Sequence, residues 1–507
     1  MIMNDGRRNK PSIEFSQTKE LMTGSSEVRS DDEPLTPIGR LLFQEEFAHV
    51  VHCALGMKHP IDVEAVKASI KDSIMVKHPR FCSLLVRDRH GVERWRRTEI
   101  DINRHFVIVN ERVAGSEDDE AAVNEYLADF ATSSGLILDK PLWEIHVLRA
   151  HNSMILRIHH SLGDGTSLLS MLLALCRKAD NPGHLPTIPS AKRRRCDGSF
   201  WCRALRFLQM VWFTIIFAFG LILRSTFWRD PKNPISGGDG VELWPKKLAT
   251  ARFLLEDMKL AKRAVPNATI NDVLLSILSR GLFRYLDEKW PNSMRTGDQM
   301  TGVVIANLRD RPGLIEYASM MTKNQGLRWG NRFGLYLAPL YYRKYKDPLD
   351  HLRKAKKMFD RRKNSLAAQF SYWIMDILMA GFGAMVSCFF TKRILCNTTF
   401  MISNMVGPRE EIAYLGNPIT YIRVTSSSLP NALTMHMVSY ADRADLQILV
   451  AKDIIPDPEF LAKCFEDALL EMNAVAAAAG SVRERPKYPK TEKPDPTCLE
   501  KPGELDP

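Results

Sequence analysis

The stretch His159-His160-Ser161-Leu162-Gly163-Asp164-Gly165 joins two segments with different hydrophobic periodicity. Before it, Met154–His159 is a short apolar run that predicts a strand; after it, Gly165–Arg177 has the spacing of an amphipathic helix. The glycines between them favour a tight turn. The sequence therefore predicts an imidazole fixed where a strand ends. Such a ring can act as a general base if its pKa lies near neutrality.

Two residues of this turn, His160 and Asp164, are the candidate catalytic residues. Asp164 follows His160 by four positions, and its carboxylate can fix the turn by binding a backbone amide or an arginine. Aspartate is also a common helix N-cap, so a purely structural role stays open. His159 is expected to be structural, and Gly165 supports the turn. From residue chemistry alone, catalysis competes with simple packing of the histidine pair.

Other catalytic motifs are missing from the sequence. It contains no G-x-S-x-G elbow, no H-E-x-x-H, no Walker A and no full G-x-G-x-x-G. A histidine without a nearby nucleophile favours direct transfer between two substrates over a covalent intermediate. We therefore expect neither a metal nor a bound cofactor.

Composition and net charge limit the classes of molecule that the protein is expected to bind. The chain has 507 residues, 45% of them hydrophobic, and a net charge of +11, which suits a membrane surface or an anionic small molecule. Nucleic acid is disfavoured, because there is no zinc-finger spacing, RNP-type motif or basic recognition helix. The nine cysteines form no C-x-x-C pair, which is typical of reduced protein facing the cytosol.

Strand-like and helix-like runs alternate along the chain, which predicts an α/β protein with two lobes. We expect disordered tails at 1–33 and 483–507, because both are polar and the second is rich in proline and charge. The lobes are assigned to 34–190 and 246–482. Strands are expected at 47–55, 143–149, 154–159, 301–307, 399–405, 419–425, 433–440 and 446–451, and helices at 62–77, 116–132, 165–177, 271–286 and 457–479.

The segment 191–245 is expected to be a basic and apolar membrane-associating linker. It opens with Lys192-Arg193-Arg194-Arg195 and continues with the apolar run Phe207–Leu223. As a helix this run reaches roughly 25 Å, short of the ~30 Å of a bilayer core. We expect it to lie in the membrane interface, since a spanning helix would put the two lobes on opposite sides; burial between the lobes is the alternative. A second apolar stretch, Tyr372–Phe390, is a weaker membrane candidate or a buried helix.

Five segments together resemble one family. The first, His159–Gly165, matches the H-H-x-x-x-D-G signature of coenzyme A-dependent acyltransferases. The other four are similar to segments of the plant and bacterial wax ester synthase/diacylglycerol acyltransferases, in the same order: Pro141-Leu142-Trp143-Glu144, Asn271-Asp272-Val273, Gly330-Asn331-Arg332-Phe333-Gly334 and Ser403-Asn404-Met405-Val406-Gly407-Pro408. Met405 replaces the usual valine. The resemblance covers roughly residues 34–475, and the basic insert is similar to that of the plant branch.

This resemblance implies a two-lobed, chloramphenicol acetyltransferase-like fold with an active-site tunnel between the lobes. His160 would be the base, Asp164 would brace its loop, and Asn271 and Asp272 would lie near the substrate pocket. The substrates would be acyl-coenzyme A and a long-chain alcohol or diacylglycerol, with acyl-coenzyme A consumed rather than kept as a cofactor. The enzyme would sit on the endoplasmic reticulum membrane, or on the plasma membrane, with its lobes in the cytosol. The oligomeric state stays open.

Three alternatives remain at this point. A condensation domain of a peptide synthetase shares H-H-x-x-x-D-G but acts on carrier-bound substrates, and this chain has no carrier domain. Soluble acyltransferases of plant secondary metabolism carry a D-F-G-W-G segment, which is missing here. A membrane-anchored relative with an inactive site is the third, although His160, Asp164 and Gly165 are intact.

Overall fold

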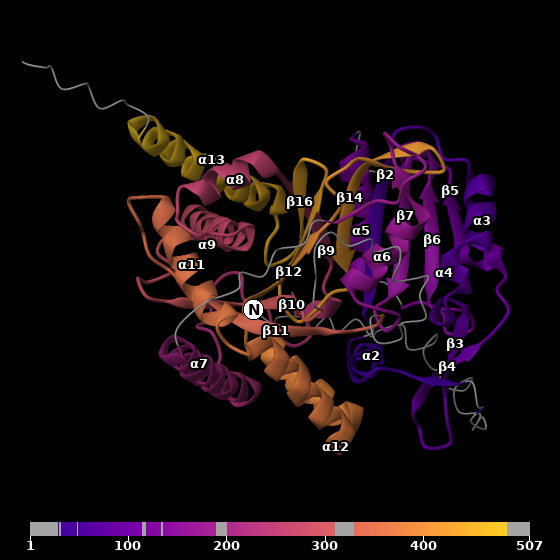
Figure 1. Cartoon of the computed structure of the whole chain (residues 1–507), viewed down its shortest axis with the longest axis horizontal. Coiled ribbons are helices and arrows are strands. Elements are labelled where there is room, and N and C mark those ends of the chain that lie inside the picture. The colour runs from indigo at the N-terminus through magenta and orange to yellow at the C-terminus, as the bar shows by residue number, and fades with distance from the viewer. Residues whose placement is uncertain are drawn as a thin grey trace, which may run out of the picture.

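The chain folds into two lobes that lie side by side, each built on a mixed β-sheet with helices (Figure 1). The structure is a computed structural model that describes residue 29 and residues 32–47, 49–113, 118–132, 135–188, 200–309 and 329–483. This arrangement confirms the predicted two-lobed α/β fold. The basic cluster at 192–195 lies outside the described residues.

The secondary structure follows the predicted alternation, with further strands in both lobes. The strands are β1 (Glu33–Pro34), β2 (Val50–Met57), β3 (Ser83–Arg87), β4 (Glu93–Arg97), β5 (Phe106–Val109), β6 (Trp143–Leu148), β7 (Ser153–His159), β8 (Arg177–Lys178), β9 (Lys246–Leu254), β10 (Gln299–Asn307), β11 (Phe333–Tyr341), β12 (Phe400–Val406), β13 (Ile412–Tyr414), β14 (Asn417–Ser426), β15 (Leu433–Tyr440) and β16 (Arg443–Ala451). The α-helices are α2 (Pro37–Phe43), α3 (Val63–Asp72), α4 (Ile74–Lys77), α5 (Asp119–Thr132), α6 (Gly165–Leu175), α7 (Phe200–Thr226), α8 (Leu255–Arg263), α9 (Ile270–Lys289), α11 (Leu349–Lys363), α12 (Ala367–Cys396) and α13 (Pro458–Arg483).

The first lobe is organised by a seven-stranded sheet of order β5-β6-β7-β2-β14-β13-β8. Strand β7, which lies between β6 and β2 in this sheet, is buried along its whole length. Beside it lies a small sheet of order β1-β4-β3. Asp32 and Glu33, which the sequence assigned to the disordered tail, belong to this folded part. The Arg96 guanidinium lies 2.7 Å from the buried Asp32 carboxylate and compensates its charge.

The second lobe is organised by a six-stranded sheet of order β11-β10-β12-β15-β16-β9. β12 pairs in parallel with both β10 and β15, while the other pairs are antiparallel. α9, α11 and α13 pack together over this sheet and enclose the largest apolar core (Figure 1). These helices therefore cover one face of the sheet, and the other face is directed toward the first lobe and α12.

The two lobes are not consecutive segments of the chain. β13 and β14 fall within 246–482, yet β14 pairs with β2 in the first sheet before β15 returns to the second. Arg423 on β14 helps to hold this crossover, because its fully buried side chain binds Asp445 of β16 at 2.8 Å and also Glu120 of α5. A division at 190 and 246 therefore does not describe the sheets, since strand pairing over this distance leaves no local sequence signal.

Two apolar helices, α7 and α12, pack against each other at one edge of the second lobe (Figure 1). Both are long and apolar enough to cross a membrane by length and composition, and only 11% of the apolar window in α7 is buried. Burial of this run between the lobes, the alternative considered from sequence, is therefore wrong. The end of α7 is fixed to the lobe, because the buried Arg224 donates to the Asn397 carbonyl at 2.6 Å and to Thr301 Oγ1 at 2.7 Å.

Candidate active site

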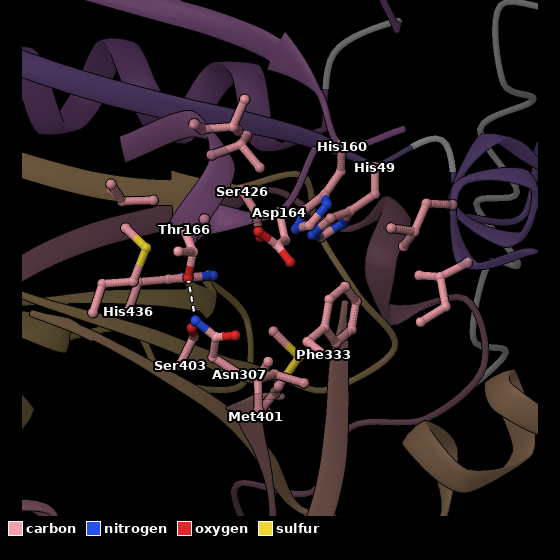
Figure 2. Close-up of a pocket in the computed structure, with 18 of the residues that line it drawn as sticks. His49, His160, Asp164, Thr166, Asn307, Phe333, Met401, Ser403, Ser426 and His436 are labelled. Carbon is pink, nitrogen blue, oxygen red and sulfur yellow. Dashed lines mark hydrogen bonds between the residues drawn. The ribbon is translucent and has the colours of Figure 1, made fainter. Parts of the chain in front are cut away.

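A mostly apolar cavity of about 230 Å³ lies between the two sheets. Its wall is formed by α2, β2, β7 and α6 of the first lobe, by β10, β11, β12 and β15 of the second, by the crossover strand β14, and by α12. His160 and His49 lie close together at one side of it (Figure 2). The histidine motif and the start of β11 thus meet at a cavity shared by both lobes.

His160 is held at the end of β7 by contacts from both lobes. Its backbone N–H donates to the His49 carbonyl at 2.8 Å. Its Nδ1 lies 3.2 Å from Asn331 Oδ1, and Asn331 Nδ2 donates to the His160 carbonyl at 2.9 Å. An amide oxygen can only accept, so the contact assigns the ring proton to Nδ1. Nε2 is then the basic nitrogen of the neutral ring.

The surroundings of His160 keep its ring neutral. Burial is the main cause that lowers the pKa of His160 below the ordinary histidine value. The negative charge of Asp164 and the hydrogen bond to Asn331 oppose this shift, because both favour the protonated ring. A pKa lowered in this way leaves the imidazole unprotonated at neutral pH, which is the form that a base requires.

His159 has a structural position. It is buried, its Nδ1 lies 2.7 Å from Ser161 Oγ, and its ring meets Phe43 edge-on with the ring centres 5.7 Å apart. Burial and the neighbouring His160 lower the pKa of His159 to about 3. Its side chain therefore packs the turn and does not line the cavity.

Asp164 binds groups from both lobes at the start of α6. Its Oδ1 accepts from Ser167 N at 3.0 Å, which is the N-cap hydrogen bond considered from sequence. Its Oδ2 accepts from Arg309 at 2.5 Å and from Arg332 N at 2.9 Å. Because the Asp164–Arg309 ion pair is buried, it ties the histidine turn to the second lobe. The adjacent Gly165 allows close packing, since a Cβ there would lie 2.3 Å from Met405 Sδ.

Asn271 and Asp272, the other candidates, do not line the cavity. Asp272 is fully buried and forms a capping box with Thr269 at the start of α9, with Lys363 3.3 Å away. In the structure its side chain caps α9. Asn271 is exposed and accepts a hydrogen bond of 2.6 Å from Asn404, which does line the cavity. It reaches the site only through that residue.

Sequence reasoning did not single out several polar residues of the cavity. His49 and His436 line it, and each has a buried Nδ1 without a hydrogen-bond partner. Burial and the neighbouring His160 lower the pKa of His436 to about 4. Asn307 Nδ2 donates to Thr166 Oγ1 at 2.6 Å across the lobes (Figure 2). The one available signal was a polar residue inside an apolar strand, as His436 is in β15.

No group of three or more histidine, cysteine, aspartate or glutamate side chains within the described ranges is arranged to hold a metal ion.

Comparisons with known proteins agree with this geometry. Residues 56–209 match the wax ester synthase/diacylglycerol acyltransferase catalytic domain, and residues 329–473 match the WS/DGAT C-terminal domain. Wax ester synthase/diacylglycerol acyltransferase 4 of Arabidopsis thaliana is 33% identical over 494 residues, which cover 90% of this chain and 93% of the relative. Wax ester synthase/diacylglycerol acyltransferase 11 of the same plant is 34% identical, covering 88% and 95%.

Solved structures share the fold at low sequence identity. Wax ester synthase/diacylglycerol acyltransferase from Marinobacter aquaeolei VT8 has a TM-score of 0.57 and 15% identity, covering 88% of this chain and 100% of the other. The first condensation domain of the calcium-dependent antibiotic synthetase, in complex with a substrate analogue, has a TM-score of 0.54 and 14% identity, covering 88% and 97%. At this low sequence identity, the similarity shows that the fold is shared.

Fold and site together define a two-lobed coenzyme A-dependent acyltransferase. Within that class, the chain belongs to the wax ester synthase/diacylglycerol acyltransferase family.

Proposed function

We propose that this enzyme transfers a fatty acyl group from acyl-coenzyme A to a long-chain alcohol, to diacylglycerol, or to both, with His160 as general base. One observation carries the proposal: Asn331 Oδ1 accepts from His160 Nδ1 and leaves Nε2 as the basic nitrogen beside the cavity. The family membership supports the reaction class, and the apolar wall suits an acyl chain.

The reaction proceeds in one displacement. His160 Nε2 takes the proton of the acceptor hydroxyl, and the oxygen attacks the thioester carbonyl. The C–S bond of the tetrahedral intermediate then breaks, and the protonated His160 gives its proton to the departing thiolate. The products are an ester and coenzyme A. Asn331 acts as a positioning residue, because its two hydrogen bonds hold the ring and its tautomer.

Asp164 supports the reaction from outside the chemistry. Its carboxylate is occupied by Ser167, Arg309 and the Arg332 amide, so it braces the turn between the lobes. Its negative charge also favours the protonated His160 that forms during transfer. Much of the rate then comes from holding two bulky substrates in line.

Membrane association is part of the proposal. Large apolar side chains on α7 and α12 are exposed; on α7 they include Trp201, Leu208, Trp212, Ile216 and Phe219, and on α12 Trp373, Ile377, Phe382, Met385 and Phe389. α12 also contributes to the cavity wall, so a lipid-facing helix adjoins the place where a lipid acceptor reacts. We place both lobes in the cytosol, with these helices in the surface of the endoplasmic reticulum or plasma membrane.

The test is turnover of acyl-coenzyme A with a panel of acceptors. Purified enzyme receives a long-chain alcohol, diacylglycerol or a carrier-bound amine, and the products are identified by mass spectrometry. Wax ester or triacylglycerol is expected, and their ratio gives the preferred acceptor. Products formed only with the carrier-bound amine would favour a condensation enzyme. Turnover no faster than background hydrolysis of acyl-coenzyme A, with every acceptor, would favour an inactive relative.

A further inference from the structure

Helix α11 carries a row of basic side chains along one face. Arg353, Lys356, Lys357 and Arg361 follow each other at helical spacing and line a groove, together with Asp360 and Asn364. None of these residues belongs to the catalytic cavity. The four cations therefore form a second polar surface outside the proposed active site.

The opposite wall of this groove is the apolar helix α7, which contributes Gln209 and Phe213. The two walls are fixed to each other, because Thr214 Oγ1 accepts from Leu366 N at 2.9 Å and the Arg362 guanidinium lies 5.7 Å from the centre of the Phe217 ring. The neighbours of Gln209 on α7, including Leu208 and Trp212, are exposed. The groove thus opens at the margin of the exposed apolar surface.

The charges in the groove are only partly compensated. Arg353 pairs with Asp347 at 2.6 Å and Asp350 at 2.7 Å, and Lys356 pairs with Asp360. Lys357 and Arg361 are exposed and have no ion-pair partner within the part of the chain that the structure describes. Two cations with the side-chain amides of Gln209 and Asn364 offer charge and hydrogen-bond donors to one anion.

We propose that this groove binds the headgroup of an anionic phospholipid, while the apolar face of α7 enters the same leaflet. Lys357 and Arg361 provide the charge for the phosphate, and Gln209 and Asn364 provide further donors. A lipid is the occupant because the groove adjoins exposed apolar side chains, where a headgroup lies next to its acyl chains. The proposal rests on the membrane association proposed above and adds a lipid preference to it.

Vesicle binding by the full chain tests this site. The probes are vesicles of phosphatidylcholine alone and of phosphatidylcholine with phosphatidic acid, and the variants are K357Q/R361Q and a matched control, K452Q/K463Q, which removes two exposed charges elsewhere. K357Q/R361Q is expected to bind the anionic vesicles about 30-fold more weakly, from about 1 kcal/mol for each charge. Its binding to phosphatidylcholine should be unchanged, and the control should match the wild type on both.

The possible outcomes distinguish failure of the proposed headgroup site from failure of the membrane association on which it rests. Wild-type protein that binds both vesicles equally, or a K357Q/R361Q variant that keeps the preference, would overturn the headgroup site and leave membrane association standing. Wild type that binds neither vesicle would overturn both. The KM for acyl-coenzyme A, measured with a short water-soluble alcohol, should be the same in all variants; a rise in K357Q/R361Q alone would assign the groove to the phosphates of coenzyme A instead. Equal melting temperatures check that the variants fold.

Discussion

A single amide decides how His160 can act. The motif predicts the histidine and its aspartate, because both stand in one short turn, but the partner of the ring comes from the second lobe. Asn331 lies 171 positions along the chain and contacts both Nδ1 and the backbone carbonyl of His160. The resemblance to G-N-x-x-G marked the segment without giving it this contact. The place of His436 in the cavity likewise depended on tertiary packing.

The pH dependence should reveal the lowered pKa of His160. Transfer needs the neutral ring, so kcat/KM should stay level through neutral pH and fall only as the pH drops below the ordinary histidine pKa of about 6.5. Asn331→Ala removes a hydrogen bond that raises this pKa, so its acid limb should move to still lower pH. Its kcat should fall by up to about 100-fold, since the ring loses its orientation. An unchanged acid limb with a lower kcat would mean that Asn331 does not contact the base.

Asp164→Asn should reduce stability and activity together. The asparagine can still cap α6, but Arg309 would keep a buried charge without its carboxylate, which costs about 3 kcal/mol. Urea unfolding and turnover are measured on the same preparation, with Glu256→Gln, at an exposed ion pair, as the control that should change neither. Lower activity at an unchanged unfolding midpoint would instead assign Asp164 a direct part in the chemistry.

At the scale of elements, buried strands and amphipathic helices were predictable, and edges and crossovers were not. β15 lies at 433–440 as predicted, and all but one of its residues are buried. β11 was not predicted: it contains Pro339, which breaks a strand pattern but is tolerated here because β11 is the edge of its sheet. β14 was predicted as a strand, but its place in the first sheet depends on pairing that no local pattern encodes.

The contact between β11 and α12 depends on Gly334. A Cβ there would lie 1.9 Å from the Ala368 carbonyl oxygen. Because this oxygen belongs to the backbone of α12, the clash can be relieved only if α12 moves. Gly334→Ala should therefore lower the free energy of unfolding by about 1–3 kcal/mol, measured by urea denaturation. Gly381→Ala in α12 is the control, because its Cβ would meet no atom within 4 Å. This change should leave the free energy of unfolding unchanged. Equal effects of the two changes would contradict the packing.

At the scale of the whole molecule, the cavity requires both lobes on one side of any membrane. His160 comes from the first lobe and Asn331 from the second, and β14 passes between their sheets. A spanning α7 would separate these parts. The exposure of α7 and α12 at one edge of the second lobe instead fits insertion into a single leaflet (Figure 1). The length and apolarity of these helices were predictable from the residues alone, whereas which of their faces is exposed depends on the fold.

Topology in sealed right-side-out microsomes tests this arrangement. Tags placed at residue 150 and at residue 480 should both be digested by added protease, because the proposed arrangement has both lobes on the cytosolic side. A lumenal marker protein that stays intact serves as the control for sealed vesicles. Protection of either tag would refute the single-leaflet placement.

The most direct measurement of the central claim is the turnover of His160→Ala. Acyl transfer from acyl-coenzyme A to a long-chain alcohol is measured beside the wild type and beside His184→Ala, a change at an exposed histidine. We expect His160→Ala to lose about 10²–10⁴-fold in kcat with the melting temperature retained, and His184→Ala to match the wild type. Turnover within tenfold of the wild type in folded His160→Ala protein would contradict the account.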